Sequence, residues 1–113
     1  MPYIATTTNV KLDDVRRSAL KTAMGEAIRL IPGKSEAWLM LSWKDETPMA
    51  FQGSQEPCAI CEVKIYGKAS PADYDRLTGA LCDVMAKHAG VPSSRVYVTY
   101  QEIENWGFDG GNF

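Results

Sequence analysis

The residues with the clearest chemical potential are the first two, Met1 and Pro2, which precede the short segment 3–5. Aminopeptidases that remove an initiator methionine tolerate a small second residue, and their action would expose the secondary amine of Pro2. An internal proline has no ionisable nitrogen, so no later position could supply this group. We therefore interpret the Pro2 amine as a general base. The alternative is that Met-Pro has no role, as in many other chains.

The composition limits the classes of protein to which this chain can belong. Its 113 residues are expected to form one domain, 1–113, with 45% hydrophobic and 23% charged residues, as in a typical globular protein. A net charge of -2 without a basic run argues against nucleic-acid binding. No apolar stretch approaches the roughly 20 residues that span a bilayer, and a signal-peptide pattern is lacking. We expect a cytoplasmic protein without a membrane partner, whose export, if any, is leaderless.

The cysteines and the single histidine offer little further chemistry. Three cysteines, an odd number, fit a reducing compartment better than a disulfide framework. Cys58 and Cys61 have the C-x-x-C spacing of thiol oxidoreductases, but side chains three apart in a strand point to opposite faces, whereas the redox motif normally starts a helix. We therefore predict structural roles for them and for Cys82, and a packed or rim position for His88. No metal site and no cofactor are expected.

The chain is predicted to contain a strand-helix-strand unit twice. Its four expected strands are residues 2–8, 37–43, 58–66 and 95–101. The first expected helix follows a short turn, carries Val15 in its buried stripe and stops at Pro32-Gly33. The second begins after Ser70, a potential N-cap, and closes at Gly90. The aromatic tail 105–113 is expected to dock on another surface.

The order of these elements predicts the fold class. Strand-helix-strand units form parallel pairs through right-handed crossovers, so two units imply an α+β domain with a four-stranded mixed sheet. Two helices of roughly 20 residues can cover only one face of that sheet. The second expected strand is apolar on both sides, with Trp38 and Met40 on one and Leu39, Leu41 and Trp43 on the other. We therefore expect another copy of the chain to bury the open face.

Several segments resemble a known family in a consistent order along nearly the whole chain. They are Met1-Pro2, Thr8-Asn9-Val10, Gly33-Lys34, Met49 to Cys61, Arg95-Val96-Tyr97 and Asn105-Trp106-Gly107-Phe108. This pattern resembles the macrophage migration inhibitory factor and D-dopachrome tautomerase family of the tautomerase superfamily. The resemblance implies a homotrimer with sheets lining a central channel and helices outside. It also implies three pockets at subunit boundaries, and keto-enol tautomerisation of phenylpyruvate-like 2-keto acids or dopachrome-type substrates.

Lys34 is the residue expected to tune the Pro2 amine. A βαβ crossover places the beginnings of the first two strands at the same end of the sheet, so Pro2 and Lys34 can lie close together. A cation about 6 Å away, at an effective dielectric near 20, disfavours protonation by roughly 3 kcal/mol, or about two pKa units. Lys34 would also pair with the substrate carboxylate. The alternative is an ordinary charge closing a helix C-terminus.

The resemblance implies roles for two tyrosines. Tyr97 would enter the pocket of a neighbouring subunit as a hydroxyl donor or an aromatic wall, although a tyrosine in a strand is more often part of the core. Tyr66 aligns with a family isoleucine whose backbone N–H helps to hold the substrate carboxylate. A backbone donor does not depend on the side chain, so Tyr66 can keep this role.

Four residues depart from the best-known member of the family. Thr99 replaces an asparagine that reaches the substrate, and Trp38 replaces a tyrosine at the rim. Trp106 and Phe108 replace a smaller aliphatic residue and a tryptophan. The pocket mouth is therefore expected to be more hydrophobic and narrower, while still admitting an aryl substrate. Inhibitor affinity and receptor binding do not carry across.

Two other functions remain open at this point. One is a cytokine-like protein that binds a protein receptor and retains the pocket without using it as an enzyme. The other is an enzyme that uses an N-terminal proline to hydrate or decarboxylate small acids. Enzymes of the second kind usually need additional arginine or carboxylate groups, which the sequence does not place near Pro2.

Overall fold

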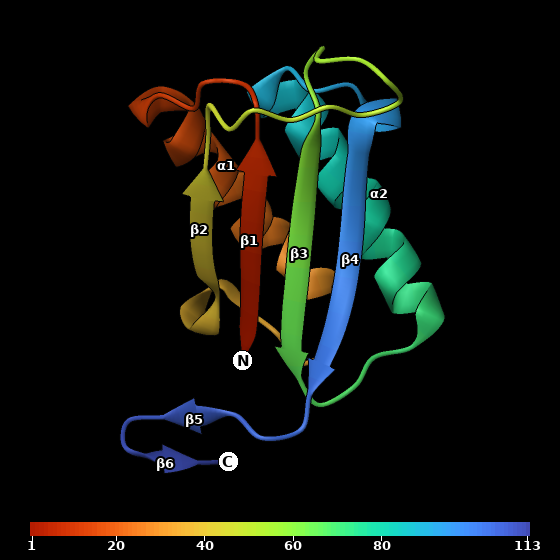
Figure 1. Ribbon diagram of the computed structural model, residues 1–113. Coiled ribbons are helices and arrows are strands. Elements are labelled where there is room, and N and C mark those ends of the chain that lie inside the picture. Colours follow the sequence, from red (N-terminus) through yellow and green to blue (C-terminus); the bar gives the residue numbers. More distant parts are fainter.

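The computed structural model describes residues 1–113. Its main elements are β1 (Pro2–Thr8), α1 (Asp14–Ala27), β2 (Met40–Lys44), β3 (Ala59–Tyr66), α2 (Pro71–Ala89) and β4 (Val96–Ile103). Short 3-10 turns lie at Ile28–Leu30, Glu36–Trp38 and Ser93–Arg95, and a small hairpin of β5 (Gly107–Phe108) and β6 (Gly111–Asn112) ends the chain. Figure 1 shows the hairpin beyond the sheet, at the end where the N-terminus lies.

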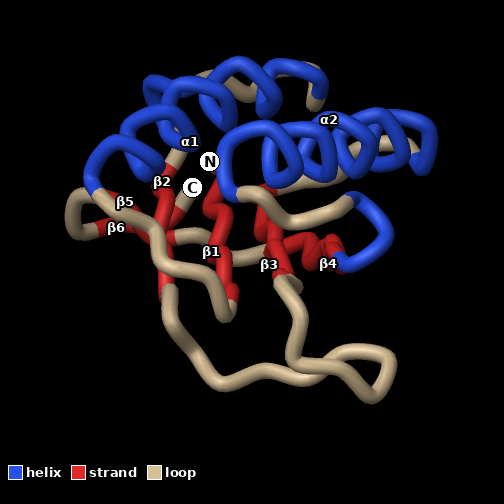
Figure 2. The backbone as a smooth tube through the Cα atoms, turned by 90° about the horizontal axis from the view of Figure 1, so that it is seen from above, coloured by secondary structure: helices blue, strands red, loops and turns tan.

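The sheet has the order β2-β1-β3-β4. The pairs β1–β2 and β3–β4 are parallel, as the two strand-helix-strand units require, whereas β1 and β3 are antiparallel. The result is the predicted four-stranded mixed sheet. Figure 2 shows both helices on one side of it, so the predicted two-layer α+β architecture is confirmed.

The core lies between the helices and the covered face of the sheet. Strands β1 and β3 alternate buried and less buried residues, because successive side chains of a strand point to opposite faces. Fully buried side chains of the core include Ile4, Leu20, Met24, Ile28, Val63, Ile65, Leu77, Leu81 and Met85. This packing fixes the sheet, and with it the position of the chain start.

The opposite face, which we call the open face, carries the other residues of each strand. It includes Tyr3, Thr7, Met40, Ser42, Lys44, Glu62, Lys64, Tyr97, Thr99 and Gln101. Met40 is 67% and Tyr97 59% exposed, but most of the others are polar, so the face is of mixed character. Strand β2 begins at Met40 because residues 36–38 form a 3-10 turn. Trp38 therefore lies before the strand and not on its face, contrary to the sequence prediction.

Helix α1 differs from its prediction in its end and in its buried stripe. It ends at Ala27 and is followed by the 3-10 turn at Ile28–Leu30, instead of continuing to Pro32-Gly33. Val15 is 78% exposed, so its assignment to the buried stripe was wrong. The buried face of α1 is set by Leu20, Met24 and Ala27. Val15 lies five residues before Leu20, which places it about 140° away around the helix axis. The predicted stripe therefore combined two different faces of one helix.

Helix α2 follows its local sequence signals. The Ser70 hydroxyl accepts a hydrogen bond from the Asp73 N–H, and the Asp73 carboxylate accepts one from the Ser70 N–H, which forms a capping box. Gly90 ends the helix at φ 69°, a conformation that favours glycine. Both predicted ends of this helix are confirmed.

Candidate active site

The start of β1 and the end of β3 bring the chain start into a polar environment. Pro2 is buried and pairs with Ile65, and the N–H of Tyr66 donates to the carbonyl oxygen of Met1 at 2.9 Å. The Lys34 Nζ donates to the carbonyl oxygen of Tyr66 at 2.8 Å. The first peptide bond of the chain therefore lies beside one cation and one backbone donor.

A tight turn places Lys34 at this position. Gly33 adopts φ 80°, which glycine tolerates without strain, and the N–H of Lys34 donates to the carbonyl oxygen of Ile31 at 3.1 Å. The turn lies between α1 and β2, at the end of the sheet where the chain starts. The topology thus brings Lys34 to the side of Pro2, as the crossover argument from the sequence expects.

The amine of the chain start is held largely neutral in this environment. Burial, the positive charge of Lys34 and the hydrogen bond with Lys34 together lower the pKa of the Met1 amine from 8.0 to about 6, and burial is the largest of the three causes. Desolvation thus lowers this pKa more than the cation does, whereas the sequence-based expectation gave a magnitude for the cation alone. This pKa belongs to the Met1 amine; Pro2, the next residue, is buried where Met1 is half-buried.

Aromatic side chains surround this end of the sheet. The rings of Trp38 and Phe108 meet edge to face with centroids 5.2 Å apart. The Phe113 ring lies 5.7 Å from Tyr66 and stacks on Phe108 at 6.2 Å. The hairpin is closed by the Phe113 N–H, which donates to the Trp106 carbonyl oxygen at 3.0 Å. The aromatic tail therefore docks against the region of the chain start.

Phe113 is a member of this aromatic cluster that sequence reasoning missed as a site residue. The available signal was its place at the end of a tail too aromatic for a flexible linker. Trp38 reaches the cluster from the 3-10 turn at 36–38, and Tyr66 from the last position of β3. Three separate segments therefore build one aromatic surface.

Tyr97 and Thr99 do not join this cluster within one chain. Tyr97 pairs with Ile60, five residues along β3 from the partner of Pro2, which is about 17 Å at the usual rise of a strand. Thr99 pairs with Glu62, about 10 Å from the same point. Both residues are exposed. Only another copy of the chain could combine Tyr97 with Pro2 in one site.

The cysteines are buried thiols. All three are free and buried, and burial raises the pKa of Cys61 to about 11, although a hydrogen bond from the Thr6 hydroxyl opposes this rise. A raised pKa disfavours the thiolate on which disulfide exchange depends. This environment favours the structural interpretation of the C-x-x-C spacing over the redox one.

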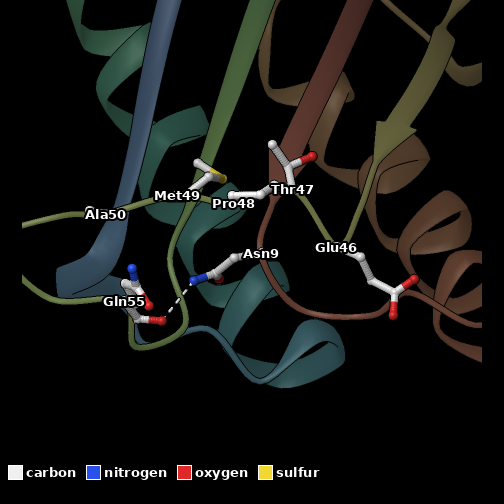
Figure 3. A pocket seen from close by; sticks show the side chains of 7 residues that line it. All are labelled: Asn9, Glu46, Thr47, Pro48, Met49, Ala50 and Gln55. Atoms are coloured by element: carbon white, nitrogen blue, oxygen red, sulfur yellow. Dashed lines mark hydrogen bonds between the residues drawn. The ribbon is translucent and has the colours of Figure 1, made fainter.

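A large hollow lies at the opposite end of the sheet and offers no comparable chemistry. It measures about 560 Å³ and is lined by Asn9, Glu46, Thr47, Pro48, Met49, Ala50 and Gln55. Figure 3 shows Asn9 directed at Gln55 while Glu46 points away. The Asn9 amide donates to the carbonyl oxygens of Gln55 and Glu56 and accepts from the Cys58 N–H. Its hydrogen-bonding capacity is therefore used to hold the loop.

The chain has neither a metal-binding cluster nor a membrane-spanning helix. No group of three or more histidine, cysteine, aspartate or glutamate residues is arranged to hold a metal ion. No helix combines the length and apolar character needed to cross a membrane. The groups that the structure brings to the chain start are an amine, the ammonium group of Lys34, a backbone donor and aromatic rings.

Comparisons with known proteins agree along the whole chain. A family model described as macrophage migration inhibitory factor matches residues 1–113. The macrophage migration inhibitory factor of Xenopus laevis is 29% identical over 115 residues, which cover 100% of this chain and 99% of that protein. The crystal structure of MIF2 from Leishmania major has a TM-score of 0.94 at 35% identity, covering 100% and 97% of the two chains. A homologue from Prochlorococcus marinus has a TM-score of 0.89 at 26% identity, covering 98% of each chain.

Proposed function

We propose, because the chain belongs to the macrophage migration inhibitory factor family and has the tautomerase fold, that it interconverts the keto and enol forms of phenylpyruvate-like 2-keto acids. The reaction is an isomerisation with Pro2 as the general base and without a cofactor. Membership of the family supports isomerase-type chemistry in general. The choice of substrate and the role of Pro2 are proposals, which the environment of the chain start supports.

The observation that carries the proposal is the lowered pKa of the amine at the chain start. A general base works best when its pKa lies near the working pH, and here burial and Lys34 lower the pKa of the Met1 amine to about 6. Removal of Met1 would transfer the free amine to Pro2. It would also take away the carbonyl oxygen that accepts from the Tyr66 N–H. The same processing step therefore creates the base and frees a donor for a carboxylate.

The proposed reaction moves one proton between carbon and oxygen. The substrate carboxylate pairs with Lys34 and the Tyr66 N–H, which holds the carbon next to the carbonyl beside Pro2. The lone pair of the Pro2 nitrogen removes a proton from that carbon, and the electron pair of the C–H bond becomes the enol double bond. The carbonyl oxygen then takes a proton from the prolinium. In reverse, the enol oxygen loses its proton and the carbon regains one.

The aromatic residues are proposed to receive the aryl group of the substrate. Trp38, Phe108 and Phe113 form edge-to-face and stacked contacts near the chain start, and aromatic rings bind another ring well in both geometries. Trp106 contributes the backbone acceptor that closes the hairpin. This arrangement favours an aryl 2-keto acid over an alkyl one.

A direct assay tests the proposed activity. We expect the wild-type protein to lose Met1 during expression, which mass spectrometry of the intact chain would show. The processed protein should then accelerate the conversion of enol phenylpyruvate to the keto form, followed by the decay of ultraviolet absorbance. The same buffer without protein is the control. A processed chain that gives only the buffer rate would reject the enzyme and leave a protein-binding role.

The site is proposed to be completed by a homotrimer. Tyr97 and Thr99 lie too far from Pro2 in their own chain, as their strand register requires. A neighbouring subunit could present both, since Tyr97 is exposed at the beginning of β4.

The assembly can be measured independently of activity. Light scattering coupled to size exclusion should give a mass about three times the 12.5 kDa of the chain. The measurement should be repeated over a tenfold range of concentration, because the mass of a weak assembly would fall on dilution. A stable monomer that retains full activity would contradict the shared site.

A further inference from the structure

The loop at residues 49–57 is bound by a buried arginine in addition to Asn9. Arg95, only 9% exposed, lies in the 3-10 turn just before β4. Its guanidinium donates to four backbone carbonyl oxygens, which belong to Phe51, Ser54, Glu56 and Pro57, at 2.8 to 3.2 Å. A guanidinium has five N–H donors in a fixed fork, so this side chain fixes the loop firmly relative to β4.

The loop in turn places one ring against Tyr97. The Arg95 guanidinium carbon lies 5.3 Å from the centre of the Phe51 ring, within cation–π range. The Phe51 ring meets the Tyr97 ring nearly edge to face, with centroids 4.8 Å apart and planes 69° apart. Phe51 is half-buried and Tyr97 is exposed. The buried Arg95 guanidinium therefore contacts the Phe51 ring, and the Phe51 ring contacts the exposed Tyr97 ring.

The Tyr97 hydroxyl, like that of Tyr66, makes no hydrogen bond within its own chain, whereas the hydroxyls of Tyr3, Tyr74 and Tyr100 each have a partner. The Tyr97 ring is therefore restrained by Phe51 while its polar end points to no group of its own subunit. This combination suits a side chain that is used by another molecule.

A small cavity lies next to the two rings. It measures about 180 Å³ and is lined mostly by apolar residues, with both Phe51 and Tyr97 at its border. If the Phe51 ring were shortened, the Tyr97 ring would have space to leave its position. Side-chain freedom that is lost on binding reduces affinity, so a Tyr97 that is already restrained binds a partner better than a mobile one.

We propose that Phe51, held by Arg95, is a positioning residue that fixes the Tyr97 ring for the active site of the adjoining subunit. This inference rests on the proposed function, in which Tyr97 contacts the substrate of a neighbour. Phe51 itself lies at the opposite end of its own sheet from Pro2 and touches no substrate. Its effect is on substrate binding through Tyr97 and not on proton transfer.

A double-mutant cycle on the processed, assembled protein tests the inference. Phe51→Leu removes the ring and is expected to raise KM for phenylpyruvate about three- to tenfold, the range expected for one aromatic pair, with kcat within twofold of the wild type. In a Tyr97→Ala background the same change should alter KM by less than twofold. A purely structural role for Phe51 would instead give equal effects in both backgrounds.

The controls use residues of the same loop. Phe51→Tyr keeps the ring and should restore the KM of the wild type. Gln55→Ala changes a side chain without a hydrogen bond in the same loop, and should leave KM unchanged. Phe51→Met replaces Phe51→Leu if the latter does not fold. An unchanged KM in the Phe51 variant, or an equal rise with and without Tyr97, would overturn the inference. Absence of activity in the wild type would reject the proposed function instead.

Discussion

Replacing Pro2 by glycine is expected to lower kcat/KM for enol phenylpyruvate by about 10² to 10⁴, the usual contribution of a positioned general base. Glycine still supplies an N-terminal amine, but a primary one on a residue without the ring that fixes the backbone of Pro2. The burial and the charge of Lys34 that lower the pKa at the chain start would remain. The loss of rate would therefore report the position and the chemistry of the amine.

A form that retains Met1 is the matched comparison. Its amine has a pKa of about 6, which already suits a base at neutral pH, but it lies one residue away from Pro2, and consecutive Cα atoms are about 3.8 Å apart. Its Met1 carbonyl also occupies the Tyr66 N–H. We expect a loss as large as that of Pro2→Gly. Circular dichroism and light scattering should match the wild type, and equal rates in all three forms would rule out Pro2 as the base.

Replacing Lys34 by methionine is expected to change both substrate binding and the pH profile. Loss of a charged hydrogen-bond donor for the carboxylate should raise KM about ten- to a hundredfold. Lys34 also lowers the pKa of the amine at the chain start, so its removal should raise that pKa. Burial, the larger cause, stays, and the pKa should therefore not return fully to its ordinary value.

The sign of the pH effect follows from the chemistry of the base. The amine is active when it is unprotonated, so kcat/KM should rise as pH increases through the pKa of that amine in the wild type. In Lys34→Met this rise should move to higher pH, which lowers the rate at pH 7. Lys34→Arg keeps the charge and should leave the pH of this rise, the acid limb of the profile, unchanged. Lys87→Met, at an exposed position of α2, should change neither KM nor the acid limb. An acid limb that does not move would show that Lys34 has no influence on the base.

Much of the fold could be predicted because its signals are local. The boundaries of α2 follow from Ser70, Asp73 and Gly90, whose hydrogen bonds and backbone angle involve neighbouring residues. The start of β2 could not be found in this way, because the apolar residues 37–39 are compatible with a strand and a 3-10 turn alike. Val15 was misassigned for a related reason, since an apolar residue near the edge of a helical stripe gives no indication of which face is covered.

The candidate site, like the fold, could be predicted from the sequence only in part. The nearness of Lys34 to Pro2 follows from the handedness of one crossover, which is a property of the topology. The dominance of burial over charge in lowering the pKa does not follow from topology, because it depends on how side chains pack around the chain start. The contacts of Phe113 and Arg95 join residues from separate segments. The pattern of a single sequence does not indicate which distant residues contact each other.

The hydrogen bond between the Met1 carbonyl and the Tyr66 N–H has a practical consequence for anyone who prepares this protein. An affinity tag fused ahead of Pro2 would acylate the nitrogen and occupy the same donor, so a tagged preparation should assay as inert. A tag after Phe113 would extend a residue that packs on Tyr66 and Phe108. Material for assays is best purified untagged, or released by a protease that leaves Pro2 as the first residue.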